Sequence, residues 1–146
     1  QLPAGLSQED EDRLIARLVG RVTGAARARG AGGDQALAAR ARQLADQYLD
    51  GVRPVSVTWS SRQQRRYGSC TPAAGTIRIS DRAAAFPSYV RDYLLVHELA
   101  HLVEEGHGPA FEALVSRYPD RDRARGFLDG LEFAAGQPPT HPNPPV

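Results

Sequence analysis

The chain contains no lysine and no methionine, and it has a single cysteine, Cys70, among its 146 residues. One cysteine cannot form a disulfide within the chain, which excludes a disulfide scaffold and any zinc site built from several thiolates. The absence of lysine excludes Schiff-base chemistry and the phosphate-binding P-loop, because both need that amine. No run of 18 apolar residues occurs, so a membrane span is not expected.

Charge of neither sign is in excess. The 18 basic residues, all arginine, nearly balance 17 acidic ones, for a formal net charge of +1. This balance argues against nonspecific nucleic-acid binding, so we expect no nucleic-acid partner.

The length suits one domain, which we place at residues 1–136, followed by a disordered proline-rich tail at 137–146. With no signal segment and no disulfide framework, we expect the protein to be cytoplasmic.

Helical spacing of apolar residues is found in the first third and in the last half of the chain. Ser7 and the acidic residues after it predict a helix that runs to about Arg29. Asp34 is expected to cap a second helix, Gln35 to Asp50, with Gly51 as its left-handed C-cap. Later helices are predicted from Ser88 to about Glu105, from Pro109 to about Arg117, and from Arg121 to about Ala135.

The middle of the chain has the period of β-strands. Alternation at Val55, Val57 and Trp59 predicts a half-buried strand. Further strands are expected at 65–71 and 75–80, joined by the turn at 72–75 into a hairpin. These elements predict an α+β fold. We expect a small antiparallel sheet packed on the buried 88–105 helix, with helices before and after it.

The informative motif is His97-Glu98-Leu99-Ala100-His101, followed by His107. Residues four apart lie on one face of a helix, so His97 and His101 can bind one metal ion. Catalytic zinc takes three protein ligands and keeps a fourth position for water. His107 is the nearest remaining histidine, and we expect Gly106 to let the chain turn back and deliver it. The expected cofactor is therefore Zn²⁺, bound by His97, His101 and His107.

Glu98 follows the first histidine by one residue, about 100° around the helix axis. This places its carboxylate near the metal without making it a ligand. We expect Glu98 to be catalytic, taking the proton of a zinc-bound water that attacks a scissile carbonyl. The extended segment from Thr76 to Ser80 is expected to hold a peptide substrate by edge pairing. The spacing of ten between His97 and His107 also matches the metzincins, but that class needs a methionine and a glycine where this chain has Glu104.

The order and spacing of several motifs resemble the YgjP-like metallopeptidase family, small zincins similar to SprT-like proteins. They are Arg66 to Thr71, Gly75 to Ser80, Tyr93 to Leu102 and His107 to Phe111. The resemblance implies zinc ligation by the three histidines and a catalytic Glu98. Tyr67 stands where the family usually has tryptophan. Members usually begin with a β-hairpin, and Gln1-Leu2-Pro3 looks like the stub of one, so the resemblance suggests that this chain lacks it.

Three functions remain open. The first is a metallopeptidase acting on peptides or proteins. The second, which one family relative suggests, is a nucleoside triphosphate pyrophosphatase, favoured if Arg62, Arg65, Arg66 and Arg78 face the metal. The third is a non-catalytic zinc-binding module, against which the presence of Glu98 argues. The sequence does not give the oligomeric state.

Other polar residues receive simpler interpretations. Cys70 is expected to be a small buried residue rather than a nucleophile. Glu112 is a candidate partner for a histidine ligand. Tyr67 and Tyr118 are the phenols that we consider for stabilising an oxyanion, and the sequence does not choose between them. His141 lies in the tail and is expected to be exposed and without a role.

Overall fold

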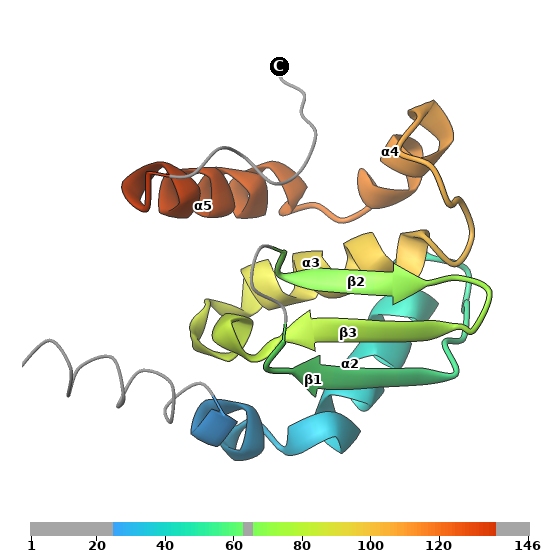
Figure 1. Cartoon of the computed structure of the whole chain (residues 1–146). Helices are drawn as coiled ribbons and strands as arrows, with labels where there is room; N and C mark the ends of the chain where they lie inside the picture. Colours follow the sequence, from blue (N-terminus) through green and yellow to red (C-terminus); the bar gives the residue numbers. More distant parts are fainter. Residues whose placement is uncertain (1–24, 63–65, 137–146) are drawn as a thin grey trace, which may run out of the picture.

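The computed structural model describes residues 25–62 and 66–136 (Figure 1). Residues 1–3, the predicted tail and most of the first predicted helix lie outside these residues, and only 25–30 of that helix are described as helical. The elements in chain order are helix α2 (Gly33–Tyr48), strands β1 (Ser56–Ser60), β2 (Gly68–Thr71) and β3 (Thr76–Ser80), the 3-10 helix η1 (Asp81–Ala85), and helices α3 (Ser88–Ala100), α4 (Pro109–Val115) and α5 (Arg121–Ala134).

The three strands form one sheet in the order β1-β3-β2, which confirms the α+β class. The expected hairpin is present: β2 pairs antiparallel with β3, with Cys70 opposite Ile77. The sheet is nevertheless mixed, because β1 pairs parallel with β3. Since β3 is the central strand, Thr76–Ser80 has no open edge for a peptide. The expectation of edge pairing there was wrong, and the edge strand near α3 is β2.

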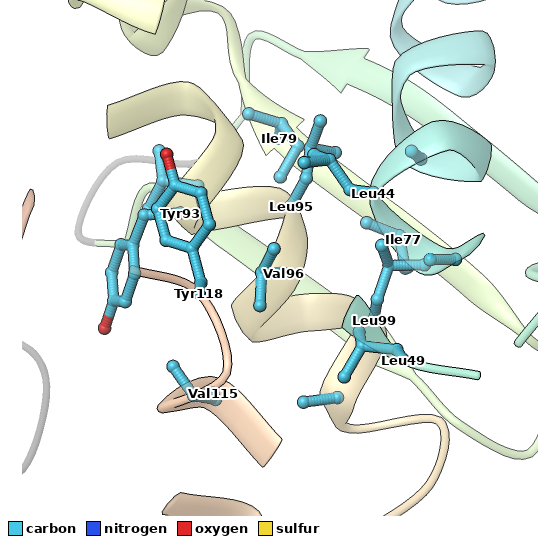
Figure 2. Packing of buried hydrophobic residues seen from close by; sticks show 14 of the residues in the cluster. Leu44, Leu49, Ile77, Ile79, Tyr93, Leu95, Val96, Leu99, Val115 and Tyr118 are labelled. Atoms are coloured by element: carbon cyan, nitrogen blue, oxygen red, sulfur yellow. The ribbon is translucent and has the colours of Figure 1, made fainter. Parts of the chain in front are cut away.

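Helix α3 is the centre of the packing, in contact with α2, α4, α5, β2, β3 and η1. On one of its sides Leu95 and Leu99 meet residues of the sheet and of α2, among them Ile77, Ile79 and Leu44 (Figure 2). On the other side Val96 and Tyr93 face Val115 and Tyr118 (Figure 2). A helix enclosed in this way must be apolar almost all round, which is the pattern that the sequence has.

Two helices begin differently from the prediction. Gly32, with φ of 94°, is the N-cap of α2, so the helix starts at Gly33 and Asp34 lies inside its first turn. The Asp34 carboxylate instead accepts the backbone N–H of Trp59 at 2.8 Å and ties β1 to α2. Pro87 rather than Ser88 caps α3, because the Pro87 carbonyl accepts the N–H groups of Val90 and Arg91.

Helix α3 also ends earlier than predicted, at Ala100 instead of Glu105. The chain tightens there: His101 and Leu102 donate their N–H groups to carbonyls only three residues back, which is 3-10 geometry. Gly106 therefore does not end the helix, and it is not among the glycines with positive φ. The early end leaves residues 101–108 as a loop that brings His107 back towards the helix.

Among the described residues, no helix is long and apolar enough to cross a membrane.

We expect Ile77→Ala to lower the free energy of unfolding by about 2–5 kcal/mol, because the change leaves a cavity in the central strand. The Ile77 side chain is fully buried between α2 and α3. Urea denaturation followed by circular dichroism measures the change. Arg78→Ala, at the exposed neighbouring position of the same strand, is the control and should stay within about 0.5 kcal/mol of the parent. Equal losses in both variants would contradict this account of the core.

Candidate metal centre and active-site cavity

The structure brings the three predicted histidines together. One ring nitrogen from each of His97, His101 and His107 lies within 4.8 Å of the other two. The Nε2 atoms of His101 and His107 are 3.1 Å apart. Two nitrogens bound tetrahedrally to one ion at the usual bond length of about 2.0–2.1 Å would be separated by about 3.3 Å, so this spacing fits a shared metal. His97 and His101 come from the last turn of α3 and its C-cap, and His107 comes from the loop after it.

The ring orientation of His101 suits a ligand. Its Nδ1 lies 3.2 Å from the backbone carbonyl of Glu104. When Nδ1 carries the proton, this hydrogen bond leaves the Nε2 lone pair free to face the other histidines. Burial lowers the pKa of His101, and the nearby charge of His107 lowers it further, against the opposing effect of the Glu104 carbonyl. The neutral imidazole that a metal requires is therefore favoured.

Phe111 supports all three imidazoles from the side of α4. Its ring stacks on His101 at a centroid distance of 4.3 Å and meets the edges of His97 and His107, each at 5.0 Å. Pro109 at the first position of α4 starts that helix two residues after His107, so Phe111 falls in its first turn. Because Phe111 is fully buried, it limits how far the imidazoles can move.

A charged clamp (Glu112, Arg121, Arg125 and Tyr93) holds α4 against α3 and α5. Arg125 donates from Nη2 to both Glu112 carboxylate oxygens, at 3.0 and 3.2 Å, and from Nε to the Tyr93 hydroxyl at 3.1 Å. Arg121 adds a bond of 3.2 Å to Glu112. Tyr93 lies one turn before His97 on α3, with ring centroids 6.0 Å apart. The clamp therefore connects α3, which carries His97, to α4, which carries Phe111.

Glu98 faces the cavity from a nearly dry position, with 6% of its surface exposed. Burial raises the pKa of its carboxyl to about 8, and the positive charge of Arg66 partly opposes this shift. A carboxyl group with such a pKa can exchange a proton near neutral pH, which general acid–base catalysis requires.

Strand β2 has a glycine, Gly68, at the point where it contacts Glu98. A Cβ added at Gly68 would lie 3.0 Å from Glu98 Oε2, 3.2 Å from Glu98 Cγ and 3.1 Å from Ile79 Cδ1. These distances are shorter than ordinary van der Waals contact, so any larger residue would press on the carboxylate. Glycine at this position lets β2 approach α3 closely.

The three histidines and Glu98 line one cavity of about 620 Å³. Strand β2 forms a wall of it through Gly68, Ser69 and Cys70, and Pro72 continues that wall. Arg66 and Glu105 are its other charged lining residues among those described. Three candidate metal ligands, a buried carboxylate and an edge strand thus share one space that is large enough for part of an extended chain.

Some of the secondary expectations fail in the structure. Glu112 pairs with Arg121 and Arg125, so it is not the hydrogen-bond partner expected for a histidine ligand. The Tyr118 hydroxyl donates to the Tyr89 carbonyl at 2.8 Å, away from the cavity. Tyr67 does line the cavity.

Cys70 and the four arginines around the hairpin are the remaining residues for which we have an expectation from the sequence. Cys70 is half-buried, and burial, with the negative charges of Glu98 and Glu105, raises the pKa of its thiol to about 11. That thiol stays protonated and is a poor nucleophile at neutral pH. Of the four arginines around the hairpin, Arg66 lines the cavity, Arg62 and Arg78 are not among its lining residues, and Arg65 lies outside the described residues.

Sequence reasoning missed Gly68, Tyr93 and Arg125. For Tyr93 a signal was present, because it stands four residues before His97 on the same face of a helix. Gly68 belongs to the motif Arg66 to Thr71 that carries the family resemblance, but no role was predicted for it, and Arg125 belongs to no motif. Their importance comes from contacts between segments that are 30 and 32 residues apart, Gly68 with Glu98 and Arg125 with Tyr93.

Arg125→Gln should lower the free energy of unfolding by about 1–3 kcal/mol, because it removes the cationic donor of the Tyr93 hydroxyl and leaves Glu112 with Arg121 alone. Arg117→Gln is the control. It breaks an ion pair with Asp50 in which the two side chains are 45% and 85% exposed, and should cost less than about 1 kcal/mol. Thermal and urea unfolding of the two variants make the comparison. The interpretation of the clamp fails if Arg117→Gln proves the more harmful change.

Two comparisons with known proteins gave a match, one by fold and one by family. The crystal structure of the metallopeptidase zymogen of Pyrococcus abyssi abylysin has the same fold, with a TM-score of 0.58 and 23% sequence identity over 69% of this chain and 96% of that one. No curated protein sequence matches the chain. The family model of the YgjP-like, metallopeptidase domain matches residues 32–129, which include the three histidines, Glu98 and the clamp. The chain therefore belongs to the YgjP-like metallopeptidase family.

Proposed function

We propose that this protein is a zinc-dependent peptidase, with His97, His101 and His107 as metal ligands and Glu98 as the catalytic residue. The observation that carries the proposal is the convergence of three imidazole nitrogens within 4.8 Å of one another, in the cavity that the Glu98 carboxylate also lines. Three neutral nitrogen donors match the ligand set of catalytic zinc sites, which keep one position for water or substrate.

Zinc bound there would supply Lewis acidity, which lowers the pKa of a water molecule and polarises a peptide carbonyl. In this proposal the Glu98 carboxylate accepts a proton from the attacking water and later transfers it to the nitrogen of the leaving amine. Its burial favours the first of these two transfers, because a dry carboxylate binds a proton more strongly than an exposed one. Phe111 and the Glu104 carbonyl keep the imidazoles oriented throughout.

The substrate would lie along β2. Among the described strands β2 pairs with β3 alone, which makes it an edge strand of the sheet, and it forms a wall of the cavity beside Glu98. An extended peptide can add to such an edge through main-chain hydrogen bonds, which are independent of its sequence. Placing the peptide on β2 rather than on β3 brings it next to the three histidines.

The alternatives have less support. Hydrolysis of nucleoside triphosphates was favoured if the arginines of the hairpin faced the metal, but among the described ones only Arg66 lines the cavity. A non-catalytic zinc module has no use for a carboxylate kept in a nearly dry position beside the ligands. A cytoplasmic location remains our prediction, and the single cysteine is compatible with it.

Glu98→Gln is expected to keep its zinc and to lose peptide hydrolysis by about 10²–10⁴-fold, because the amide cannot accept the proton of water. The measurements are zinc content after dialysis and cleavage of an unstructured quenched fluorescent peptide. Nucleoside triphosphates are assayed in parallel. His107→Ala should instead lose both zinc and activity.

Asp46→Asn is the control, because it makes the same change from acid to amide at a side chain that is 58% exposed and does not line the cavity. It should retain parental activity. Full activity of Glu98→Gln would refute the assigned role, and triphosphate hydrolysis without peptide cleavage would overturn the ranking of the two functions.

Gly68→Ala is expected to lower kcat by about tenfold or more with little change in zinc content, because the new methyl group displaces the Glu98 carboxylate. Gly126→Ala, at a position where an added Cβ meets nothing within 4 Å beyond the adjacent backbone of its own helix, provides the control and should leave kcat unchanged. Steady-state kinetics with the same quenched peptide distinguish the two variants. Equal kcat in both would show that the close approach of β2 to Glu98 is not needed.

A further inference from the structure

The active-site cavity has opposite charges at two places along its wall. Arg66 stands two residues before Gly68, where β2 begins, and Glu105 comes from the loop after α3. The negative charge of Glu105 acts on Cys70, which lies further along the strand, whereas the positive charge of Arg66 acts on Glu98, which lies against Gly68. Apart from the buried Glu98, the charge on the cavity wall is therefore positive at Arg66, where β2 begins, and negative at Glu105, within electrostatic reach of Cys70.

In the part of the chain that the structure describes, neither Arg66 nor Glu105 is neutralised by an oppositely charged partner. No ion pair joins Arg66 or Glu105 to a described residue, and both side chains are exposed. The backbone of Arg66 is held instead, because Arg82 donates to its carbonyl at 2.9 Å and lies over the Tyr67 ring at 4.7 Å. A guanidinium group on an anchored backbone is available to a carboxylate, which it can bind through two parallel hydrogen bonds.

The direction of β2 relates these charges to a substrate. Antiparallel pairing is the more stable arrangement for an added strand. A peptide antiparallel to β2 would place its C-terminal residues near Gly68 and Arg66, and its N-terminal residues near Cys70 and Glu105. The side of the cleaved bond that carries the leaving amine then faces the guanidinium group.

We propose that Arg66 and Glu105 make the cavity selective for charge, so that it prefers peptides with a carboxylate on the C-terminal side of the cleaved bond and disfavours acidic residues on the N-terminal side. The carboxylate is that of an Asp or Glu side chain or of the peptide's own C-terminus. This inference rests on the proposed peptidase function and deepens it.

The test uses the zinc-loaded full chain and quenched fluorescent peptides that are identical except at one position. Glu, Gln or Lys occupies each of the first three positions after the cleaved bond, and a further pair differs only in a free or an amidated C-terminus. The parent protein should cleave the best Glu peptide with a kcat/KM at least tenfold above that of its Lys counterpart. The difference should lie mainly in KM, because the contact is made already in the bound substrate, and it should shrink at high salt.

Arg66→Glu should reverse the preference, so that the Lys peptide becomes the better substrate. Arg78→Glu is the matched control: it makes the same change of charge on the same hairpin, at an exposed position that does not line the cavity. It should keep the preference of the parent. Glu105→Arg should remove the penalty for acidic residues before the cleaved bond.

Each result decides a different point. Cleavage without a charge preference, or an equal change in Arg66→Glu and Arg78→Glu, overturns the charge selectivity and leaves the peptidase function standing. A preference for the free over the amidated C-terminus, without one for Glu side chains, identifies the terminal carboxylate as the group recognised. If the zinc-loaded parent cleaves none of the peptides, the proposed function fails, and the selectivity inference fails with it.

Discussion

The carboxylate of Glu98 is held almost out of water, and much of this structure can be understood from that constraint. A buried carboxyl group is costly unless its surroundings are arranged around it. Here the strand beside it has a glycine at the point of contact, an arginine lies near enough to oppose its pKa shift, and α3 is fixed on both sides by apolar packing. The metal-ligand candidates His97 and His101 lie in the same helix and at its C-cap, so the packing that fixes the Glu98 carboxylate also fixes their imidazoles.

The rigidity around the histidines comes from outside the motif itself. Phe111 touches all three imidazoles, and its helix is held to α3 and α5 through Glu112 and Arg125. The hydrogen bond from His101 to the Glu104 carbonyl depends on the early end of α3. The five-residue motif therefore supplies the chemical groups, while segments up to residue 125 set their positions.

The sequence was most informative where chemistry is encoded locally. The spacing of His97, Glu98 and His101 on a helix can be read from its period of 3.6 residues, and the hairpin could be predicted from its turn at 72–75. The ends of helices were less predictable. Asp34 and Ser88 are good capping residues, yet the N-caps are Gly32 and Pro87. Each helix begins before the predicted residue, and Gly32 can adopt the positive φ that this start requires. The parallel pairing of β1 and the contact of Gly68 with Glu98 could not be predicted, since both arise between segments that only the tertiary fold brings together.

The mixed sheet has a consequence for the order in which the molecule folds. Strands β2 and β3 are joined by a short turn and can pair as soon as that turn forms, on the microsecond scale typical of hairpins. Strand β1 pairs with the far edge of β3, with β2 between them in the sequence, so its ladder has to close a longer loop. In the folded sheet the Asp34 carboxylate of α2 accepts the Trp59 N–H of this strand. We therefore expect the β2–β3 hairpin, which includes the cavity wall, to form first. Strand β1, at the other edge of the sheet, would then pack onto it together with α2.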